Sequence, residues 1–302
     1  PFVAFVSLSL SPTSHHSLMS TDTTSSSVTD APEPPSFLTA LIAGGMAGTC
    51  VDVALFPIDT VKTRLQAPGG FFRNGGFTRI YSGIVAAAAG SAPGAAIFFG
   101  TYETCKRIQL PYESSFGIHN KRRHDTVSHM VAASIGETAA CLVRVPTEVV
   151  KAKQQTSHST FVQTVRDVLR EPHHFVIGGG LYRGFGMTLF REIPFCMIQF
   201  PLYEHWKRHY NATTPLQAAA CGSAAGAVAA AITTPLDVIK TRLMLGRDHN
   251  NKMYGGVLDV VTSIYKHDGM YAFWSGLQPR VVWITLGGFV FFGSYECSKL
   301  LV

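Results

Sequence analysis

An eight-residue pattern occurs three times in this chain and limits its fold more than any other feature. Each copy holds a proline, an acidic residue two positions later, a lysine three positions after the acid, and a second base two positions further on. The copies begin at Pro57, Pro146 and Pro235 and are evenly spaced. A pattern that recurs at one period indicates repeated supersecondary units. We expect a disordered tail and three repeats, over residues 1–36, 37–124, 125–213 and 214–302.

A second pattern alternates with the first and closes an apolar stretch in each repeat. It is a Tyr-Glu pair with a lysine three positions after the glutamate, at Tyr102-Glu103 with Lys106, Tyr203-Glu204 with Lys207, and Tyr295-Glu296 with Lys299. Each repeat is therefore predicted to be a helix, a polar loop and a second helix. The six expected helices cover roughly 37–66, 83–107, 126–155, 184–208, 215–244 and 278–300.

The composition places these helices in a membrane. Apolar residues make up 46% of the chain and charged residues 15%, with a mean hydropathy of +0.18. A soluble domain carries about 25% charged residues, so this balance argues against a soluble enzyme, a disordered chain or a coiled coil. Each expected helix is long enough to cross the hydrocarbon layer. We predict an all-α membrane protein with six transmembrane helices in three pseudo-symmetric repeats.

Other features of the sequence point to no further partner. The net charge of +6 is scattered along the chain, with one run of three bases at Lys121-Arg122-Arg123, so no nucleic acid is expected. The six cysteines stand singly, without metal-ligand spacing, so neither a metal nor a cofactor is expected. An apolar run over residues 1–10 resembles the core of a signal peptide. It lacks preceding bases, and a tail with Met19 as the start is the preferred interpretation.

The charged residues of the two patterns are predicted to form two gates. A charge inside a bilayer is costly unless it is paired or faces water. Threefold pseudosymmetry would bring the acids and lysines of the first pattern into one ring. We call this ring the first gate; it comprises Asp59, Lys62, Glu148, Lys151, Asp237 and Lys240. The second gate, at the opposite mouth, comprises Glu103, Lys106, Glu204, Lys207, Glu296 and Lys299, beside Tyr102, Tyr203 and Tyr295. Two rings that open in turn give alternating access; static ion pairs are the alternative.

The triple motif Pro-x-acid-x-x-base-x-base resembles that of the mitochondrial carrier family over residues 37–302. The resemblance implies a barrel of six helices that works as a monomer among the lipids of the inner mitochondrial membrane. It also implies that the first gate faces the matrix, with the pairs Asp59–Lys151, Glu148–Lys240 and Asp237–Lys62. The second gate would face the cytoplasm, with the pairs Glu103–Lys207, Glu204–Lys299 and Glu296–Lys106.

The same resemblance assigns a bracing role to two glutamines. Gln66 and Gln155 occupy positions at which the family carries glutamines that support the matrix-side pairs. Met244 occupies the third position, so the third brace is expected to be missing.

Candidate substrate contacts are the positions that differ between the repeats, because the gates are threefold and a substrate is not. On the first helices these positions lie five, nine and two residues before the motif proline. Five residues before the proline, the three repeats have Asp52, Cys141 and Ala230. Nine residues before it they have Gly48, Glu137 and Gly226, and two residues before it they have Leu55, Arg144 and Thr233. Asp52 lies two helical turns before Asp59, and Glu137, Arg144 and Glu148 follow one helical stripe, so these side chains share the face of the gate acids.

The second helices add a further set of unequal positions. Thirteen and twelve residues before the second-gate glutamate stand Gly90-Ser91, Arg191-Glu192 and Trp283-Ile284. We predict a substrate site of Asp52, Glu137, Arg144, Ser91, Arg191, Glu192 and Phe195. Acids outnumber bases in this set, which suits a zwitterion with an additional positive charge. The alternative is that Asp52 and Arg144, or Glu192 and Arg191, neutralise each other as packing pairs.

Within the family, several stretches resemble the branch that transports S-adenosylmethionine. They include Gly69 to Gly76, Arg191 to Phe195 and Gln199 to Leu202. This resemblance implies import of S-adenosylmethionine in exchange for S-adenosylhomocysteine. A carrier of another cationic or zwitterionic metabolite, such as a basic amino acid or thiamine pyrophosphate, is the alternative.

Two other classes fit less well. A methyltransferase would need a strand followed by a glycine-rich loop, which the sequence lacks, and a scaffolding membrane protein would not need two gates. We expect no enzymatic activity.

Overall fold

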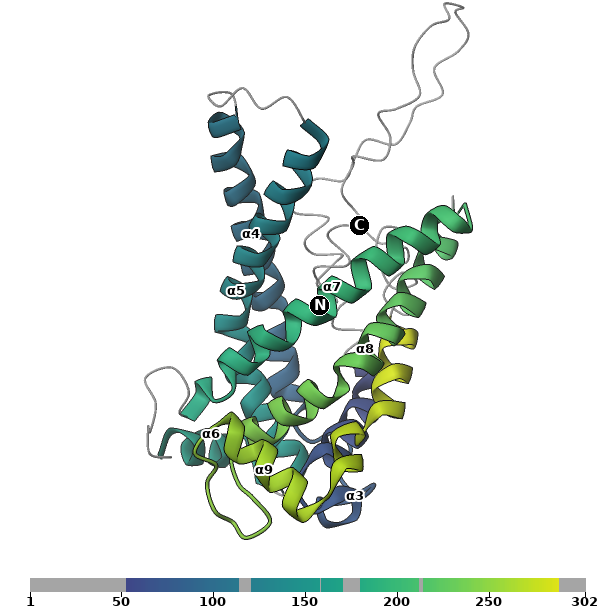
Figure 1. Ribbon diagram of the computed structural model, residues 1–302. Helices are drawn as coiled ribbons and strands as arrows, with labels where there is room; N and C mark the ends of the chain where they lie inside the picture. Colours follow the sequence, from purple (N-terminus) through teal and green to yellow (C-terminus); the bar gives the residue numbers. More distant parts are fainter. Residues whose placement is uncertain (1–52, 114–120, 158, 171–179, 212–213, 288–302) are drawn as a thin grey trace, which may run out of the picture.

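The computed structural model describes residues 53–113, 121–157, 159–170, 180–211 and 214–287 (Figure 1). These residues are mostly helical, and among them the only β-type pairing is one isolated bridge between Arg247 and Met253. The predicted tail over residues 1–36 lies outside the described residues.

The helices follow the predicted order of two per repeat. The long ones are a helix over 53–66, α4 (Ile84–Glu113), α5 (Lys121–Thr156), α7 (Phe185–His209), α8 (Pro215–Leu245) and a helix over 277–287. The short ones are α3 (Gly70–Arg73), α6 (Phe161–Arg170), η2 (Gly180–Tyr182), α9 (Val257–His267) and η3 (Met270–Trp274). The short helices lie in the loops that join the two helices of a repeat.

Local sequence explains how α8 begins and ends. The hydroxyl of Thr214 accepts a hydrogen bond from the backbone N–H of Gln217, whose side chain returns one to Thr214. This reciprocal cap satisfies two N-terminal donors. Gly246 ends the helix in the left-handed conformation, with φ 85°, which glycine adopts without steric cost. Pro146 and Pro235 lie inside α5 and α8, and both helices continue on either side of them.

The second helix of one repeat packs against the first helix of the next. α4 packs along α5, and α7 packs along α8 (Figure 1). Gly90 leaves room for Thr147 of α5, because a Cβ at this position would lie 2.1 Å from the Thr147 hydroxyl oxygen. Small residues allow helix backbones to approach in this way. Gly90, which is unequal between the repeats, therefore has a packing role.

Three loop glycines join the repeats in cyclic order at the end of the bundle that carries α3, α6 and α9. Gly83, Gly184 and Gly276 have φ values of 94°, 83° and 76° and precede the second helix of each repeat. An added Cβ at these positions would lie 3.1, 3.8 and 3.2 Å from the carbonyl oxygens of Lys151, Lys240 and Lys62. Each glycine thus contacts a first-gate lysine backbone of the following repeat, and repeat three contacts repeat one.

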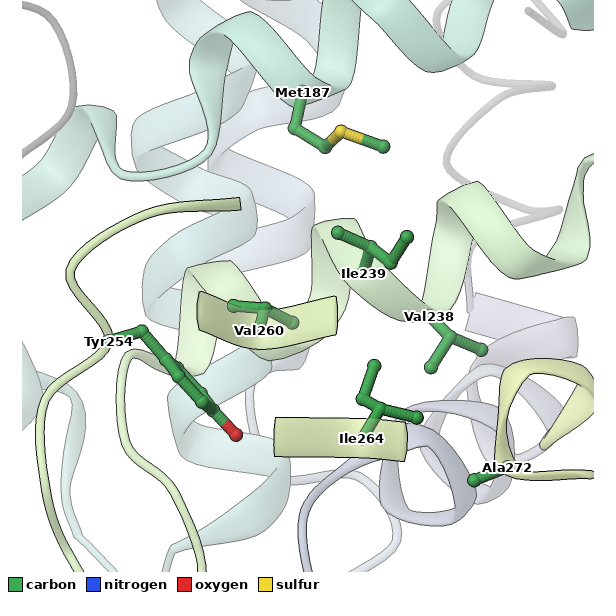
Figure 2. Close-up of a cluster of buried hydrophobic side chains, with 7 residues drawn as sticks. All are labelled: Met187, Val238, Ile239, Tyr254, Val260, Ile264 and Ala272. Carbon is green, nitrogen blue, oxygen red and sulfur yellow. The ribbon is translucent and has the colours of Figure 1, made fainter. Parts of the chain in front are cut away.

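An apolar cluster fixes the third polar loop against the end of α8 (Figure 2). Val260 and Ile264 of α9 are fully buried against Val238 and Ile239 of α8. α9 is amphipathic: Val260 and Ile264 lie on its buried face, and Asp259 and Lys266 are exposed. This packing holds the loop directly beside the first-gate residues of α8.

Within the described residues, one helix is long and apolar enough to cross a membrane by length and composition, at Gln217–Leu245. A shorter apolar helical stretch lies at Ile84–Phe98. Charged residues inside the helix lower the hydropathy of α5 and α7; they include Glu137 and Arg144 in α5 and Arg191 in α7. The arrangement of six spanning helices stays a prediction.

Candidate functional site

The three ion pairs expected in the first gate are present. Lys151 Nζ lies 2.8 Å from Asp59 Oδ2, Lys240 Nζ lies 2.7 Å from Glu148 Oε2, and Lys62 Nζ lies 2.7 Å from Asp237 Oδ2. Each pair joins two repeats, because the acid and the lysine of one helix lie on the same face and meet different neighbours. The geometry is that of a closed ring; that the ring opens during a transport cycle stays a prediction.

Two glutamine amides contact this ring where the family pattern places braces. Gln66 Nε2 donates to Asp237 Oδ2 at 3.0 Å, and Gln155 Nε2 donates to Asp59 Oδ2 at 3.0 Å. Both glutamines are fully buried. Met244, at the third position, is buried in an apolar cluster beside Val145 and Val149. The Glu148–Lys240 pair is instead supported by Arg144, whose Nε lies 3.2 Å from Glu148 Oε1.

Arg144 links the predicted substrate site to the first gate. Its Nη2 donates to Glu137 Oε1 at 2.6 Å and lies 3.6 Å from Glu192 Oε1. The second oxygen of Glu137, Oε2, is buried and has no hydrogen-bond partner among the described residues. Cys141 Sγ lies beside this pair, 3.7 Å from Arg144 Nη2 and 3.8 Å from Glu137 Oε1. The predicted stripe of α5 therefore forms one connected polar row.

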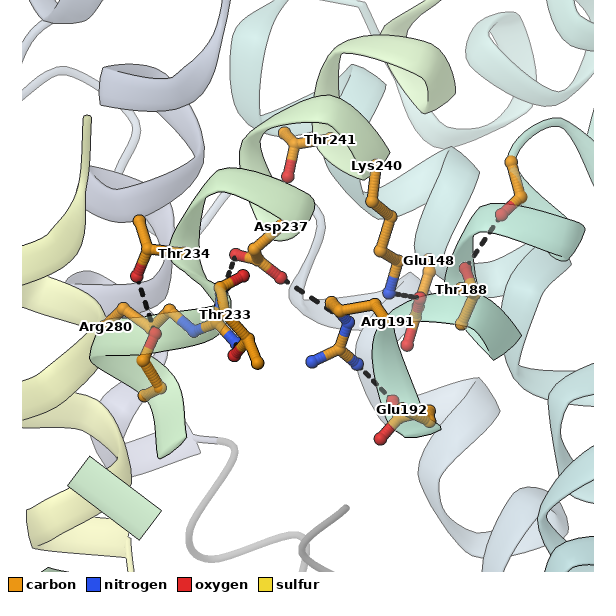
Figure 3. A network of polar contacts seen from close by, with 12 residues as sticks. Glu148, Thr188, Arg191, Glu192, Thr233, Thr234, Asp237, Lys240, Thr241 and Arg280 are labelled. Carbon is orange, nitrogen blue, oxygen red and sulfur yellow. Dashed lines mark hydrogen bonds and ion pairs between the residues drawn. The ribbon is translucent and has the colours of Figure 1, made fainter. Parts of the chain in front are cut away.

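The Arg191-Glu192 pair of α7 is buried beside this row (Figure 3). Arg191 Nη2 contacts Glu192 Oε1 directly, and Arg191 Nε lies 3.7 Å from Asp237 Oδ1. Because Arg144 also reaches Glu192, side chains of α5 and α7 converge on one polar centre. Arg191–Glu192, one of the two packing pairs given as the alternative to substrate contacts, is therefore present. Asp52, of the other pair, lies outside the described residues. That a substrate replaces the Arg191–Glu192 contact stays a prediction.

The contacts described for Phe195 and Ser91 are with groups other than the charged residues of this centre. Phe195 is buried with Ala229 and Ala230 in an apolar cluster between α7 and α8. Ser91 Oγ donates to the Ala88 carbonyl of its own helix at 3.3 Å. Their roles as substrate contacts stay predictions. Asp52 lies outside the described residues.

Arg280, in the helix over 277–287, is a further charged residue at this centre that was not predicted from the sequence. Arg280 is buried, and its Nη1 lies 3.3 Å from Asp237 Oδ2. Its guanidinium also donates to the Thr233 hydroxyl at 2.9 Å and to the Thr233 carbonyl at 3.2 Å. A comparison of the residues four positions after each loop glycine would have found it, since these are Ala87, Thr188 and Arg280.

Arg280 adds a third arginine beside the polar centre, together with an acid that it pairs with. The residues predicted from the sequence were the acids Asp52, Glu137 and Glu192 and two arginines. Because Arg280 pairs with the gate acid Asp237, it does not by itself neutralise these acids, and the excess of negative charge stays a prediction. In Figure 3, Arg280 and Arg191 lie on either side of Asp237.

The second gate lies mostly beyond what the structure describes. Tyr102, Glu103 and Lys106 fall within α4, but their side chains are not among those described, and Tyr295, Glu296 and Lys299 lie outside the described residues. Glu204 is exposed and pairs with Arg208 of the same helix at 3.3 Å. Lys207 Nζ lies 5.6 Å from the centre of the Tyr203 ring. The pairing of the second gate stays a prediction.

A second polar cluster lies in the loop after α8, away from the central residues. Arg242 Nη1 donates to Asp268 Oδ2 at 2.5 Å, and His249 Nε2 lies 3.0 Å from Asp268 Oδ1. Burial by itself would raise the pKa of Asp268, but the hydrogen bonds from Arg242 and His249 outweigh it and hold the pKa below its ordinary value of 3.8. Arg242 also donates through Nε to the Gln66 carbonyl at 3.0 Å, so this cluster ties the third repeat to the first.

Comparison with known sequences decides the family. A sequence profile described as mitochondrial carrier protein matches three successive stretches, residues 33–113, 122–214 and 211–302. The chain belongs to the mitochondrial carrier family. The three matches agree with the triple motif and with the cyclic contacts between repeats, while the repeat boundaries drawn from the sequence stay predictions.

Among individual members of the mitochondrial carrier family, several are similar over nearly their whole length. The mitochondrial S-adenosylmethionine carrier protein of Danio rerio is 45% identical over 86% of this chain and 96% of its own. The protein of the same name in Mus musculus is 44% identical over 89% of this chain and 97% of its own. The S-adenosylmethionine mitochondrial carrier protein homolog of Drosophila melanogaster is 46% identical over 88% and 93%.

Proposed function

We propose that this mitochondrial carrier transports S-adenosylmethionine across the inner mitochondrial membrane into the matrix, in exchange for S-adenosylhomocysteine. The observation that carries the proposal is identity of 44–46% over almost the full length of proteins named for this substrate. The chemistry of the polar centre supports it independently of those names. The chain is a multi-pass protein of the inner membrane and acts as a transporter rather than an enzyme.

The substrate carries charged groups that the centre can recognise. S-adenosylmethionine has a carboxylate, an ammonium group, a sulfonium and an adenine ring. The carboxylate would bind Arg191, because a guanidinium presents two parallel donors to a carboxylate. The ammonium and the sulfonium would lie near Glu137, Glu192 and Asp52. The unpartnered Oε2 atom of Glu137 offers an acceptor for the ammonium without breaking the bond to Arg144.

In the proposed transport cycle, the three pairs of the first gate close the matrix side of a six-helix barrel in a monomeric protein. A substrate that enters from the cytoplasm binds at the centre, one to two helical turns from the gate acids. The substrate would bind more tightly to the intermediate state than to either state with one gate closed. This difference in binding energy would favour opening of the first gate and closing of the second. Arg144 would transmit part of this change, because it contacts both a central acid and a gate acid.

Reconstitution tests the proposed substrate. Purified protein in liposomes loaded with S-adenosylhomocysteine should take up labelled S-adenosylmethionine, and external unlabelled S-adenosylhomocysteine should compete. Competition by lysine or thiamine pyrophosphate, in place of S-adenosylhomocysteine, would assign the chain to the alternative class of cationic or zwitterionic metabolites. Preferred uptake of ATP or citrate would contradict both.

A further inference from the structure

Asp237 has more cationic neighbours than its gate pair requires. Lys62 Nζ lies 2.7 Å from its carboxylate, Arg280 Nη1 lies 3.3 Å away, and Arg191 Nε lies 3.7 Å away. Gln66 Nε2 adds a hydrogen bond at 3.0 Å. Asp237 would therefore keep a lysine and an amide if an arginine turned toward another anion.

Arg280 occupies one of two sequence positions at which repeats two and three exchange an arginine and a threonine. In repeat two, an arginine stands two residues before the motif proline and a threonine stands four after the loop glycine; these are Arg144 and Thr188. In repeat three the two residue types are exchanged, as Thr233 and Arg280. Repeat one has Leu55 and Ala87 there, so it supplies no arginine.

This exchange indicates that repeats two and three each need a guanidinium near the first gate. In repeat two the first helix supplies it, through Arg144, and in repeat three the second helix supplies it, through Arg280. The Thr233 hydroxyl and carbonyl hold Arg280 from one side, at 2.9 and 3.2 Å, and so fix the direction of the side chain. Figure 3 shows Arg280 and Arg191 on either side of Asp237.

We infer that Arg280 is a second carboxylate-binding residue of the substrate site, which acts with Arg191 to select substrates that carry a carboxylate. This inference rests on the proposed function. When substrate binds while the first gate is still closed, its carboxylate would replace Asp237 as the partner of Arg280, and Asp237 would retain Lys62 and Gln66 until that gate opens. The cost of this exchange is small because no buried charge is left without a partner.

Paired substrates separate a binding role from a structural one. Proteoliposomes are assayed with S-adenosylmethionine and with its decarboxylated analogue, which keeps the sulfonium, amine and adenine but lacks the carboxylate. The wild-type protein should prefer the carboxylated compound. Arg280→Gln should reduce this preference, as the ratio of kcat/KM values, at least about 10-fold, since it removes a hydrogen bond between charged groups. The change should lie in the KM for S-adenosylmethionine, with transport of the analogue little altered.

Two matched variants complete the test. Arg280→Lys keeps the charge but loses the two-donor geometry, so it should reduce the preference less than Arg280→Gln does. Thr233→Val removes the hydroxyl that holds Arg280 but keeps the carbonyl that also accepts from it, so it should reduce the preference less than Arg280→Gln does. If Arg280→Gln does not accumulate, the lysine variant alone decides, through a lower preference for the carboxylated substrate.

Three outcomes would overturn the inference: equal losses for both substrates in the Arg280 variants, an unchanged preference in those variants, or a wild-type protein that transports both compounds equally well. A wild-type protein that transports neither compound would instead contradict the proposed function itself.

Discussion

Arg144 and Glu148 lie one turn apart on α5, with 3.2 Å between Arg144 Nε and Glu148 Oε1. This contact supports the one first-gate pair that has no glutamine, since Met244 stands where Gln66 and Gln155 stand in the other repeats. Arg144 therefore replaces the missing brace and at the same time holds Glu137 at 2.6 Å.

The replacement predicts a partial rescue. Arg144→Met should destabilise the carrier strongly, because removing one partner of a buried ion pair costs about 3–5 kcal/mol. Adding Met244→Gln should restore part of the loss, since by the symmetry of the repeats its amide would reach Glu148. The melting temperature of the purified protein in detergent measures both effects. A double variant no more stable than Arg144→Met would show that Arg144 does not act as a brace.

Two ion pairs of the first gate should differ in how well they tolerate exchange of the acid and the lysine. Asp59 and Lys151 form a simple pair at 2.8 Å, so the double variant Asp59→Lys with Lys151→Asp should recover transport at least about 10-fold over either single change. The corresponding exchange of Asp237 and Lys62 should recover little, because a lysine at position 237 would face Arg280 and Arg191. Equal recovery at both pairs would mean that the arginines do not act on Asp237.

Close packing of α4 on α5 depends on Gly90. Gly90→Ala would place a Cβ 2.1 Å from the Thr147 hydroxyl oxygen and 2.8 Å from its Cβ, and should cost about 1–3 kcal/mol or more through overpacking. Gly94→Ala is the matched control in the same helix, because a Cβ there meets no atom within 4 Å. Thermal unfolding should separate the two variants clearly. Similar melting temperatures would show that the helices are not in contact at Gly90.

The Asp268 cluster predicts a pH dependence of stability. The pKa of Asp268 is lowered in the folded protein, because hydrogen bonds from Arg242 and His249 outweigh the effect of burial. A lowered folded-state pKa stabilises the protein above the unfolded value and ceases to do so as the pH falls through the folded value. Asp268→Asn should therefore melt earlier than the wild type at pH 7, with a difference that shrinks below about pH 4. A difference that stays constant down to pH 3 would contradict the lowered pKa.

The sequence predicted the ion pairs of the first gate because they follow from a repeated motif. Asp59–Lys151, Glu148–Lys240 and Asp237–Lys62 require only that the three repeats contact one another in cyclic order. The order of the helices was predicted for the same reason, through the alternation of two motifs. The positions of Gln66 and Gln155 followed from the family pattern.

Residues without threefold counterparts were harder to place from the sequence. Arg280 lies one turn from the compared positions, and a single arginine in an apolar stretch gives no signal until its contacts with Asp237 and Thr233 are seen. The burial of Phe195 depends on side-chain packing between α7 and α8, which no periodicity encodes. The role of Arg144 as a brace depends on a distance between atoms in the folded chain.

Exchange in liposomes tests most directly whether the polar centre carries S-adenosylmethionine. Wild-type protein and Arg191→Ala are compared with Arg166→Ala, a change at an exposed position of α6 remote from the centre in sequence. We expect that internal S-adenosylhomocysteine drives uptake of labelled S-adenosylmethionine by the wild type and by Arg166→Ala. Uptake by Arg191→Ala should be at least about 10-fold slower, through loss of a hydrogen bond between charged groups. Uptake by Arg191→Ala at the wild-type rate, or wild-type uptake no faster than into liposomes without protein, would contradict this expectation.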